Sequence, residues 1–281
     1  MPVAMIDGLE TNYEILGSGP PLLMLAPGAF DATMDKWTNT RAWKEVNAVA
    51  VLAQQCTLIL YDRRESGASG GRVERLGWSL FTRQAKGLLD ELNIESAFVM
   101  GGCMGCSVAM AFAADYPQAT RGLVLHWPTG GARWRANMLA KFRQHAEFVK
   151  LNGLDGVIAR ARAGETFWTG SDAGPWGSSI NRSPEFAEEF GAQDLDRYLG
   201  LVAASGPGLY DRDTVPGCSA EEAMGVKAPA LIIPGDDPSH ATSGAHYLRE
   251  CLPYPEFWHA MPLDQGTQAT CDKILDFCAH H

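Results

Sequence analysis

The chain has 281 residues, of which 46% are apolar, 20% charged and 9% aromatic, and its formal net charge is −10. This composition is typical of a globular protein and excludes a disordered or fibrous one. A chain of this length can bury a large core without disulfides or a structural metal. The negative charge and the absence of a Lys/Arg-rich run argue against nucleic acid as a partner.

The first sixteen residues contain no basic segment followed by a long apolar one, so we expect no signal peptide. The longest apolar stretches, near residues 20–25 and 48–53, are far too short to span a membrane. The seven cysteines are odd in number and lack a framework spacing, which is typical of reduced thiols in the cytosol. We therefore expect a cytoplasmic protein without a membrane partner. The sequence leaves open whether it forms a homo-oligomer.

The first half of the chain alternates short apolar runs with amphipathic stretches, which is the pattern of an α/β fold. Four strands are predicted there, at residues 21–26, 57–61, 97–101 and 122–127. A helix is predicted at 77–93, where the apolar residues fall on one helical face, and another at 104–116, which Pro117 ends.

The pattern changes between residues 128 and 217, where the periodicity is helical and no strand is evident. Alternation then resumes with a strand, a helix, a strand and a helix, at residues 230–234, 243–251, 256–261 and 269–277. The simplest architecture is a parallel sheet built from residues 1–127 and 218–281, with a helical insertion at 128–217. Ligands of such sheets bind at the carboxyl ends of the strands, so an insertion at that place would cover the ligand as a cap.

The motif that carries chemistry is Gly101-Gly102-Cys103-Met104-Gly105, which lies between a predicted strand and the next helix. It has the G-x-nucleophile-x-G pattern of a nucleophile elbow, with Cys103 as the nucleophile. The sharp turn strains the backbone and requires tiny neighbours on each side. A sulfur at a helix N-terminus is favoured as thiolate, and the Met104 N–H points to where an oxyanion would form.

With these residues the sequence resembles the α/β-hydrolase family over nearly its whole length. Pro27-Gly28-Ala29 is similar to the family's oxyanion loop, although Pro27 stands where His is common. Residues 61–69 are similar to its D-x-R-G-x-G-x-S turn, with Glu65 in place of the usual glycine, and residues 229–237 resemble the strand and loop that carry its acid. The resemblance implies a mostly parallel eight-stranded sheet flanked by helices, with an inserted helical cap. It also implies that Ala29 and Met104 donate the oxyanion hydrogen bonds.

Two departures from the family pattern bear on the chemistry. The nucleophile is Cys103 rather than serine, as in the dienelactone hydrolases of this family. The family's catalytic histidine normally precedes the last helix, but residues 261–267 contain none. A thiol depends less than a hydroxyl on a base, because it is partly ionised near neutral pH and is intrinsically nucleophilic.

Three other histidines are candidates for the base. His240 comes first because it lies in the loop after the strand 230–234, at the carboxyl edge of the sheet. His126 is the alternative, at the end of the strand beside the elbow strand, and His259 falls in the last predicted strand. Asp236 and Asp237 are both candidates for the acid. Asp237 is closer to the family's usual position, where it would orient the histidine.

Other readings of these residues remain. Cys103 and Cys106 form a C-x-x-C pair, which suggests a redox dithiol or half of a metal site, whereas Cys106 as plain helix packing is the simpler interpretation. Glu65 is either a substrate-binding or acid–base group or a turn carboxylate paired with a neighbouring arginine. Trp127 and Phe30 are expected to contact the substrate, and the tryptophans of the insertion favour an apolar or aromatic one.

The sequence therefore predicts a cysteine-dependent hydrolase of a small ester, lactone or thioester, acting through an acyl-Cys103 intermediate. A carbon–carbon bond of a ring-cleavage product is a further candidate substrate, since the resemblance covers enzymes of that kind. No metal or organic cofactor is expected. The alternative hypothesis is an α/β-hydrolase fold that has lost catalysis and binds a hydrophobic small molecule.

Overall fold

The computed structural model describes residues 2–210 and 215–281, apart from the side chains of residues 41 and 42. Its centre is an eight-stranded sheet with the strand order β1-β2-β4-β3-β5-β6-β7-β8. β2 pairs antiparallel with β1 and β4, and all other neighbours are parallel, which confirms the mostly parallel sheet. The strands are β1 (Val3–Ile6), β2 (Leu9–Leu16), β3 (Pro21–Leu25), β4 (Thr57–Tyr61), β5 (Ala97–Gly102), β6 (Thr120–His126), β7 (Ala230–Ile233) and β8 (Pro255–Phe257).

The central strands form because their sequences are continuous apolar runs. β5 and β7 are buried at every position, as are β3 and β4 beyond their first residue. Such runs suit strands that helices cover on both faces. The hairpin of β1 and β2 was not predicted, because it lies at the sheet edge and β1 alternates between exposed and buried residues. β8 is shorter than expected and ends before His259.

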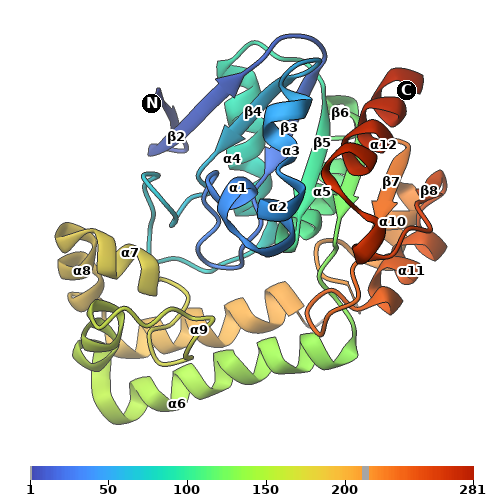
Figure 1. Cartoon of the computed structure of the whole chain (residues 1–281). Coiled ribbons are helices and arrows are strands. Elements are labelled where there is room, and N and C mark those ends of the chain that lie inside the picture. Colours follow the sequence, from blue (N-terminus) through green and yellow to red (C-terminus); the bar gives the residue numbers. More distant parts are fainter. Residues whose placement is uncertain (1, 211–214) are drawn as a thin grey trace.

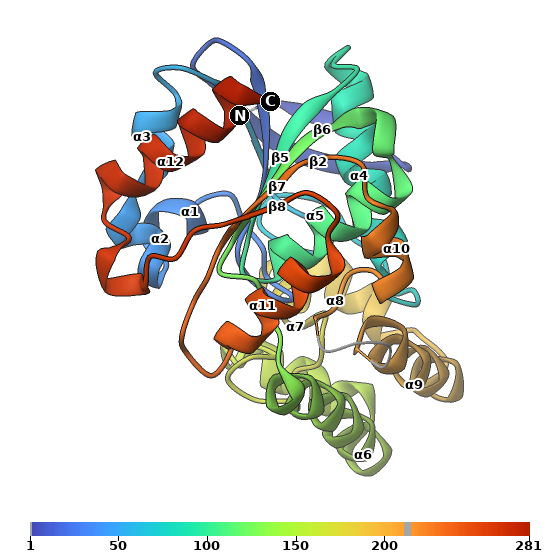
Figure 2. The same ribbon diagram turned by 90° about the vertical axis from the view of Figure 1, so that its right-hand side faces the viewer.

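Helices cover both faces of the sheet (Figures 1 and 2). One face carries α1 (Lys36–Asn39), α2 (Arg41–Val46), α3 (Ala48–Leu52) and α12 (Thr267–His280). The other carries α4 (Trp78–Glu91), α5 (Met104–Asp115), α10 (Ala220–Gly225) and α11 (Thr242–Cys251). Two short 3₁₀ turns, η1 (Pro117–Ala119) and η2 (Pro262–Asp264), complete this part of the chain. A buried apolar cluster lies under each helical layer.

Of the described helices between β6 and β7 in the sequence, the four that precede α10 lie at one end of the sheet in both views (Figures 1 and 2). They are α6 (Ala132–Arg162), α7 (Gly177–Arg182), α8 (Pro184–Gly191) and α9 (Leu195–Tyr210). α6 bends at Gly153, whose φ of 66° is not helical. Buried aromatic side chains join these helices, and His145 on α6 shares a 2.6 Å hydrogen bond with the Tyr198 hydroxyl on α9.

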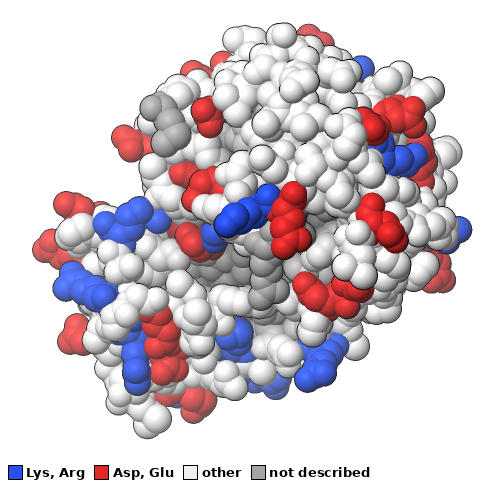
Figure 3. Space-filling model, in the orientation of Figure 1, with Lys and Arg blue, Asp and Glu red and all other residues white. Residues whose placement is uncertain are grey.

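The surface mixes charges of both signs. Acidic and basic side chains are interspersed over the face seen in Figure 3. Among the described helices, none combines the length and the apolar character that crossing a membrane would require.

Candidate active site

Cys103 lies on a strained turn between β5 and α5. Its φ of 54° and ψ of −125° fall outside the regions that side-chain-bearing residues usually adopt. The turn is tight enough that a Cβ on Gly101 would overlap the backbone of Gly105, and one on Gly105 would overlap that of Leu25. The two flanking glycines therefore allow the close approach that holds the Cys103 thiol at the carboxyl end of the sheet.

Backbone N–H groups face the Cys103 sulfur. Hydrogen bonds from the N–H groups of Gly28 and Met104 favour its thiolate form. Gly28 has a φ of 122°, and a Cβ there would lie 2.6 Å from the Asp31 carbonyl oxygen, so the loop requires glycine at this position. Ala29, which the sequence indicated as the second donor, lines the cavity beside the sulfur, and its carbonyl accepts a hydrogen bond from Arg63.

His240 and Asp237 form a bonded pair on the loop after β7. Nδ1 of His240 lies 2.9 Å from Oδ2 of Asp237. Oδ1 of Asp237 accepts hydrogen bonds from the backbone N–H groups of Ser239 at 2.7 Å and His240 at 3.0 Å. The two backbone contacts hold the carboxylate in place, and its contact with Nδ1 leaves Nε2 for the Cys103 thiol. The contact of Nε2 with the thiol lacks regular hydrogen-bond geometry, but the two groups are close enough to shift each other's pKa.

The pKa values in this cluster favour a thiolate–imidazolium pair. Burial alone would raise the pKa of Cys103, but the charge of His240 and the two backbone donors outweigh it and lower that pKa below its usual 9.0. Burial likewise opposes a charge on His240, yet the Cys103 thiolate and the Asp237 carboxylate raise its pKa from 6.5 to about 9. The hydrogen bond from His240 lowers the pKa of Asp237 to about 2 against the effect of burial.

The other candidates for base and acid lie elsewhere. The ring of His126 is fully buried, and burial together with the charge of His240 lowers its pKa to about 3, so it is uncharged at neutral pH. His259 is exposed beside Phe257, with ring centroids 5.0 Å apart. Asp236 is exposed as well, whereas Asp237 faces the imidazole.

The loop that carries the family's histidine holds Gln265 here. This side chain is 4% exposed and uses its whole amide. Its Oε1 accepts a hydrogen bond from Nε1 of Trp127 at 2.6 Å, and its Nε2 donates to the carbonyls of Pro234 and Ala260 at 2.8 and 2.9 Å. The histidine of the pair is supplied instead by the β7 loop, three residues after its acid.

A cavity of about 260 Å³ opens above Cys103 and His240. Its lining is mostly apolar and comes from the loop after β3, the start of α5, α6 and the segment 166–178. Phe30, predicted to contact substrate, is part of this lining, together with Trp134, Met138, Phe167 and Trp168. Trp127 is not; it packs against His240 behind the cavity. The lining also contains a Lys36–Asp31 ion pair of 2.8 Å.

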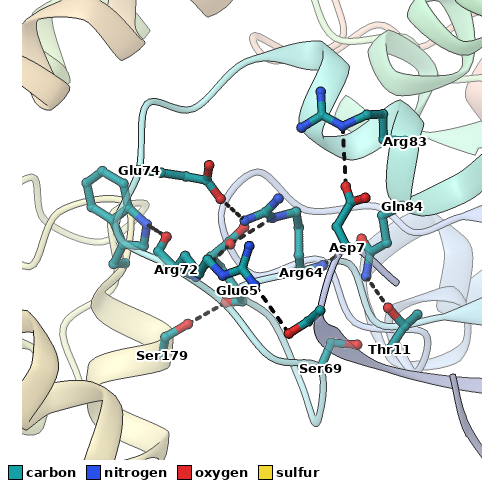
Figure 4. A network of polar contacts seen from close by, with 12 residues as sticks. Asp7, Thr11, Arg64, Glu65, Ser69, Arg72, Glu74, Arg83, Gln84 and Ser179 are labelled. Atoms are coloured by element: carbon teal, nitrogen blue, oxygen red, sulfur yellow. Dashed lines mark hydrogen bonds and ion pairs between the residues drawn. The ribbon is translucent and has the colours of Figure 1, made fainter. Parts of the chain in front are cut away.

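Glu65 lies outside that lining, in a buried polar network shown in Figure 4. Its Oε1 is 2.9 Å from Nε of Arg64 and 3.2 Å from the backbone N of Arg72. Its carbonyl accepts a 2.8 Å hydrogen bond from the Ser179 hydroxyl on α7. Glu65, which lies in the turn after β4, thus joins that turn to α7, and its carboxylate is paired with Arg64, as one of the two interpretations of the sequence expects.

The second thiol of the C-x-x-C pair is fully buried. Sγ of Cys106 lies 3.1 Å from the carbonyl oxygen of Gly101 and faces the strands, and burial raises its pKa well above the usual value. Within residues 2–210 and 215–281, no three His, Cys, Asp or Glu side chains gather as a metal site would require.

Comparison with known proteins places the chain in a family. Residues 21–172, more than half of the sequence, match the family model described as the alpha/beta hydrolase fold. The sheet order, the elbow and this match agree, and the chain belongs to the α/β-hydrolase fold family.

Individual relatives are similar over part of the chain. A 2-hydroxymuconate semialdehyde hydrolase of a Pseudomonas species is 30% identical over 125 residues, which are 44% of this chain and 41% of that protein. A 2-hydroxy-6-oxononadienedioate/2-hydroxy-6-oxononatrienedioate hydrolase of Paraburkholderia phymatum is 35% identical over 118 residues, 42% of this chain and 39% of that one. The chain spans between about a third and a half of the length of the curated relatives that it matches.

The likeness of fold extends over the whole chain. The crystal structure of the enol-lactonase from Burkholderia xenovorans superposes with a TM-score of 0.61 and 20% identity, and the match covers 99% of this chain and 100% of that one.

Proposed function

We propose that this chain is a hydrolase that uses Cys103 as a covalent nucleophile on a small ester, lactone or thioester. The observation that carries the proposal is the Cys103–His240–Asp237 arrangement at the floor of the cavity. It supplies a thiol with a lowered pKa, an adjacent imidazolium and an acid that orients it.

The reaction follows from these positions. The thiolate attacks the carbonyl carbon, and the N–H groups of Met104 and of the Gly28–Ala29 loop stabilise the oxyanion. The tetrahedral intermediate collapses to acyl-Cys103 as the imidazolium of His240 donates its proton to the leaving oxygen or sulfur. Neutral His240 then takes a proton from water, which attacks the thioester. Collapse of the second intermediate releases the carboxylic acid, and Cys103 again forms a thiolate beside the imidazolium.

The cavity favours an apolar or aromatic acyl group, because Phe30, Trp134, Met138 and Phe167 form much of its lining. Relatives named for ring-cleavage products support testing these compounds, including cleavage of a carbon–carbon bond. We propose residues 1–127 and 218–281 as the catalytic core and 128–217 as a cap, since α6 and the segment after it cover the cavity.

Turnover of a defined panel tests the proposal. The panel contains an enol-lactone, an aryl ester, an aryl thioester and a 2-hydroxy-6-oxo dienoate, each assayed with wild type, Cys103→Ala and Cys278→Ala. Cys278 is a matched control because burial raises the pKa of its thiol to about 12. We expect Cys103→Ala to lose turnover and Cys278→Ala to keep it. Binding without turnover, unchanged in Cys103→Ala, would instead establish the binding-protein alternative.

A further inference from the structure

Trp127 has a left-handed backbone conformation, which is unusual for a residue with a bulky side chain. It follows the last residue of β6, and its φ is 56°. A bulky side chain is rare in this left-handed region, and such strain persists only where the surroundings impose it. The Trp127 N–H donates to the carbonyl of Ile233 at 2.8 Å, which ties the strained residue to the end of β7.

A single buried amide locks the Trp127 side chain. Its indole N–H donates to Gln265, and the same amide bonds the carbonyls of Pro234, at the end of β7, and Ala260, after β8. Gln265 therefore joins three segments that meet behind His240. Because every hydrogen-bonding group in this set has a partner, the indole has one favoured orientation.

The locked indole packs on His240. Their ring centroids are 5.6 Å apart, and Trp43 adds a third ring, 5.8 Å from His240 and 6.0 Å from Trp127. The loop is tight here as well, since a Cβ on Gly235 would lie 2.6 Å from Cβ of His240 and 3.2 Å from Cδ2 of Trp127. The His240 side chain is only 4% exposed, so these contacts restrict where its ring can turn.

In the described part of the chain, the titratable groups that act on His240 or respond to its charge come from three segments. Cys103 approaches from the turn between β5 and α5, Asp237 from the loop of His240 itself, and uncharged His126 from β6. Asp237 fixes one ring nitrogen but leaves rotation about that hydrogen bond open. Packing by Trp127 removes this freedom and directs the second nitrogen toward the sulfur.

We propose that Trp127 and Gln265 are positioning residues that hold the His240 ring over the Cys103 thiol. The inference rests on the proposed function, because it assigns a role to the partner of the nucleophile. Neither residue lines the cavity, so they act on the reaction through His240 and not through the substrate.

The test uses Gln265→Met and Trp127→Phe, each with a matched control. Gln84 is also 4% exposed, and its amide accepts from the Arg64 N–H at 2.8 Å and donates to Oγ1 of Thr11 at 3.1 Å and the Asp62 carbonyl at 3.3 Å (Figure 4). Gln84→Met therefore removes an equally bonded amide away from His240. Trp176→Phe removes an indole N–H bond of 3.1 Å to the Arg72 carbonyl.

The readout is the pH dependence of Cys103 alkylation by iodoacetamide, measured on the Cys103 peptide by mass spectrometry, with thermal unfolding in parallel. We expect Gln265→Met and Trp127→Phe to raise the alkylation midpoint by about one pH unit, which slows alkylation about tenfold at any pH well below the wild-type midpoint. Both controls should keep the wild-type midpoint, even if their unfolding temperature falls as much as that of the test variants. If one test variant does not fold, the other carries the comparison.

Two failures can be told apart. Wild-type midpoints in both test variants, or equal shifts in the controls, would overturn the positioning role while leaving the nucleophile in place. An ordinary-thiol midpoint in the wild type, unchanged by His240→Ala, would instead overturn the Cys103–His240 pair and the proposed function with it.

Discussion

Asp237→Asn isolates the charge that supports His240. The substitution keeps the size of the side chain but removes the carboxylate that faces Nδ1 of His240 at 2.9 Å. Asp236→Asn is its matched control, since the adjacent carboxylate is exposed to solvent. The pair of variants therefore separates a specific contact from a general loss of negative charge.

The magnitude follows from the pKa of Asp237. Its fall from 3.8 to about 2 corresponds to about 2 kcal/mol. The Asp237 side chain is 25% exposed, so solvent screening reduces this interaction energy to about 1–2 kcal/mol. The larger rise in the pKa of His240, from 6.5 to about 9, also contains the effect of the Cys103 thiolate, so the Asp237 value describes this pair better. Because the folded-state pKa of Asp237 is the lower one, this stabilisation is present above pH 3.8 and is lost as the pH falls through about 2.

We expect Asp237→Asn to lower kcat/KM by about 5- to 30-fold, the factor that 1–2 kcal/mol represents. Its unfolding temperature should fall by about 2–8 °C. Asp236→Asn should match the wild type in both. Initial rates on a substrate that the wild type turns over, together with calorimetry at pH 7, measure the two effects. Equal losses in the two variants, or none in Asp237→Asn, would refute the assignment of Asp237.

Three further predictions concern the oxyanion loop, the charge of His240 and the Glu65 network. Gly28→Ala places a Cβ 2.6 Å from the Asp31 carbonyl oxygen and displaces the Gly28 N–H that faces the Cys103 sulfur, so kcat should fall about 100-fold. The control Gly200→Ala adds a Cβ in open space and should leave kcat unchanged. The raised pKa of His240 means that its cation stabilises the folded state; this contribution is complete below pH 6.5 and is lost as the pH rises through about 9. Because His240 then loses the proton that it donates to the leaving group, kcat should decline above pH 9. A flat alkaline profile would argue against its role as acid. Glu65→Gln should reduce the free energy of unfolding by about 1–3 kcal/mol, because it weakens the ion pair with Arg64. The alkylation midpoint of Cys103 should stay at the wild-type value, and a shifted midpoint would place Glu65 in the active site.

The sequence predicts the parts of this fold that depend on local pattern. β4 coincides with the predicted range 57–61, and β3 and β7 end within a residue of theirs, because buried parallel strands are continuous apolar runs. The edge hairpin of β1 and β2 has no such run, and its pairing depends on contacts that no short window contains.

In the candidate site, too, contacts between residues that are near in sequence could be predicted and long-range contacts could not. Asp237 and His240 are three residues apart on one loop, so the sequence could bring them together with Cys103 at the carboxyl edge of the sheet. The hydrogen bond from the Gly28 N–H to the Cys103 sulfur could not be predicted, because it depends on backbone angles around a positive φ. The contact between Trp127 and Gln265 joins residues 138 positions apart, and nothing in the local sequence of either residue indicates it.

Formation of an acyl-enzyme would show directly that Cys103 is the nucleophile. Intact mass is followed over time after mixing with an activated acyl ester, for wild type, Cys103→Ala and His240→Ala. We expect a transient adduct on the wild type that disappears as the ester is hydrolysed, none on Cys103→Ala, and slower formation and decay on His240→Ala. An adduct of equal yield on Cys103→Ala, or turnover that survives this substitution, would contradict the assignment of Cys103 as the nucleophile.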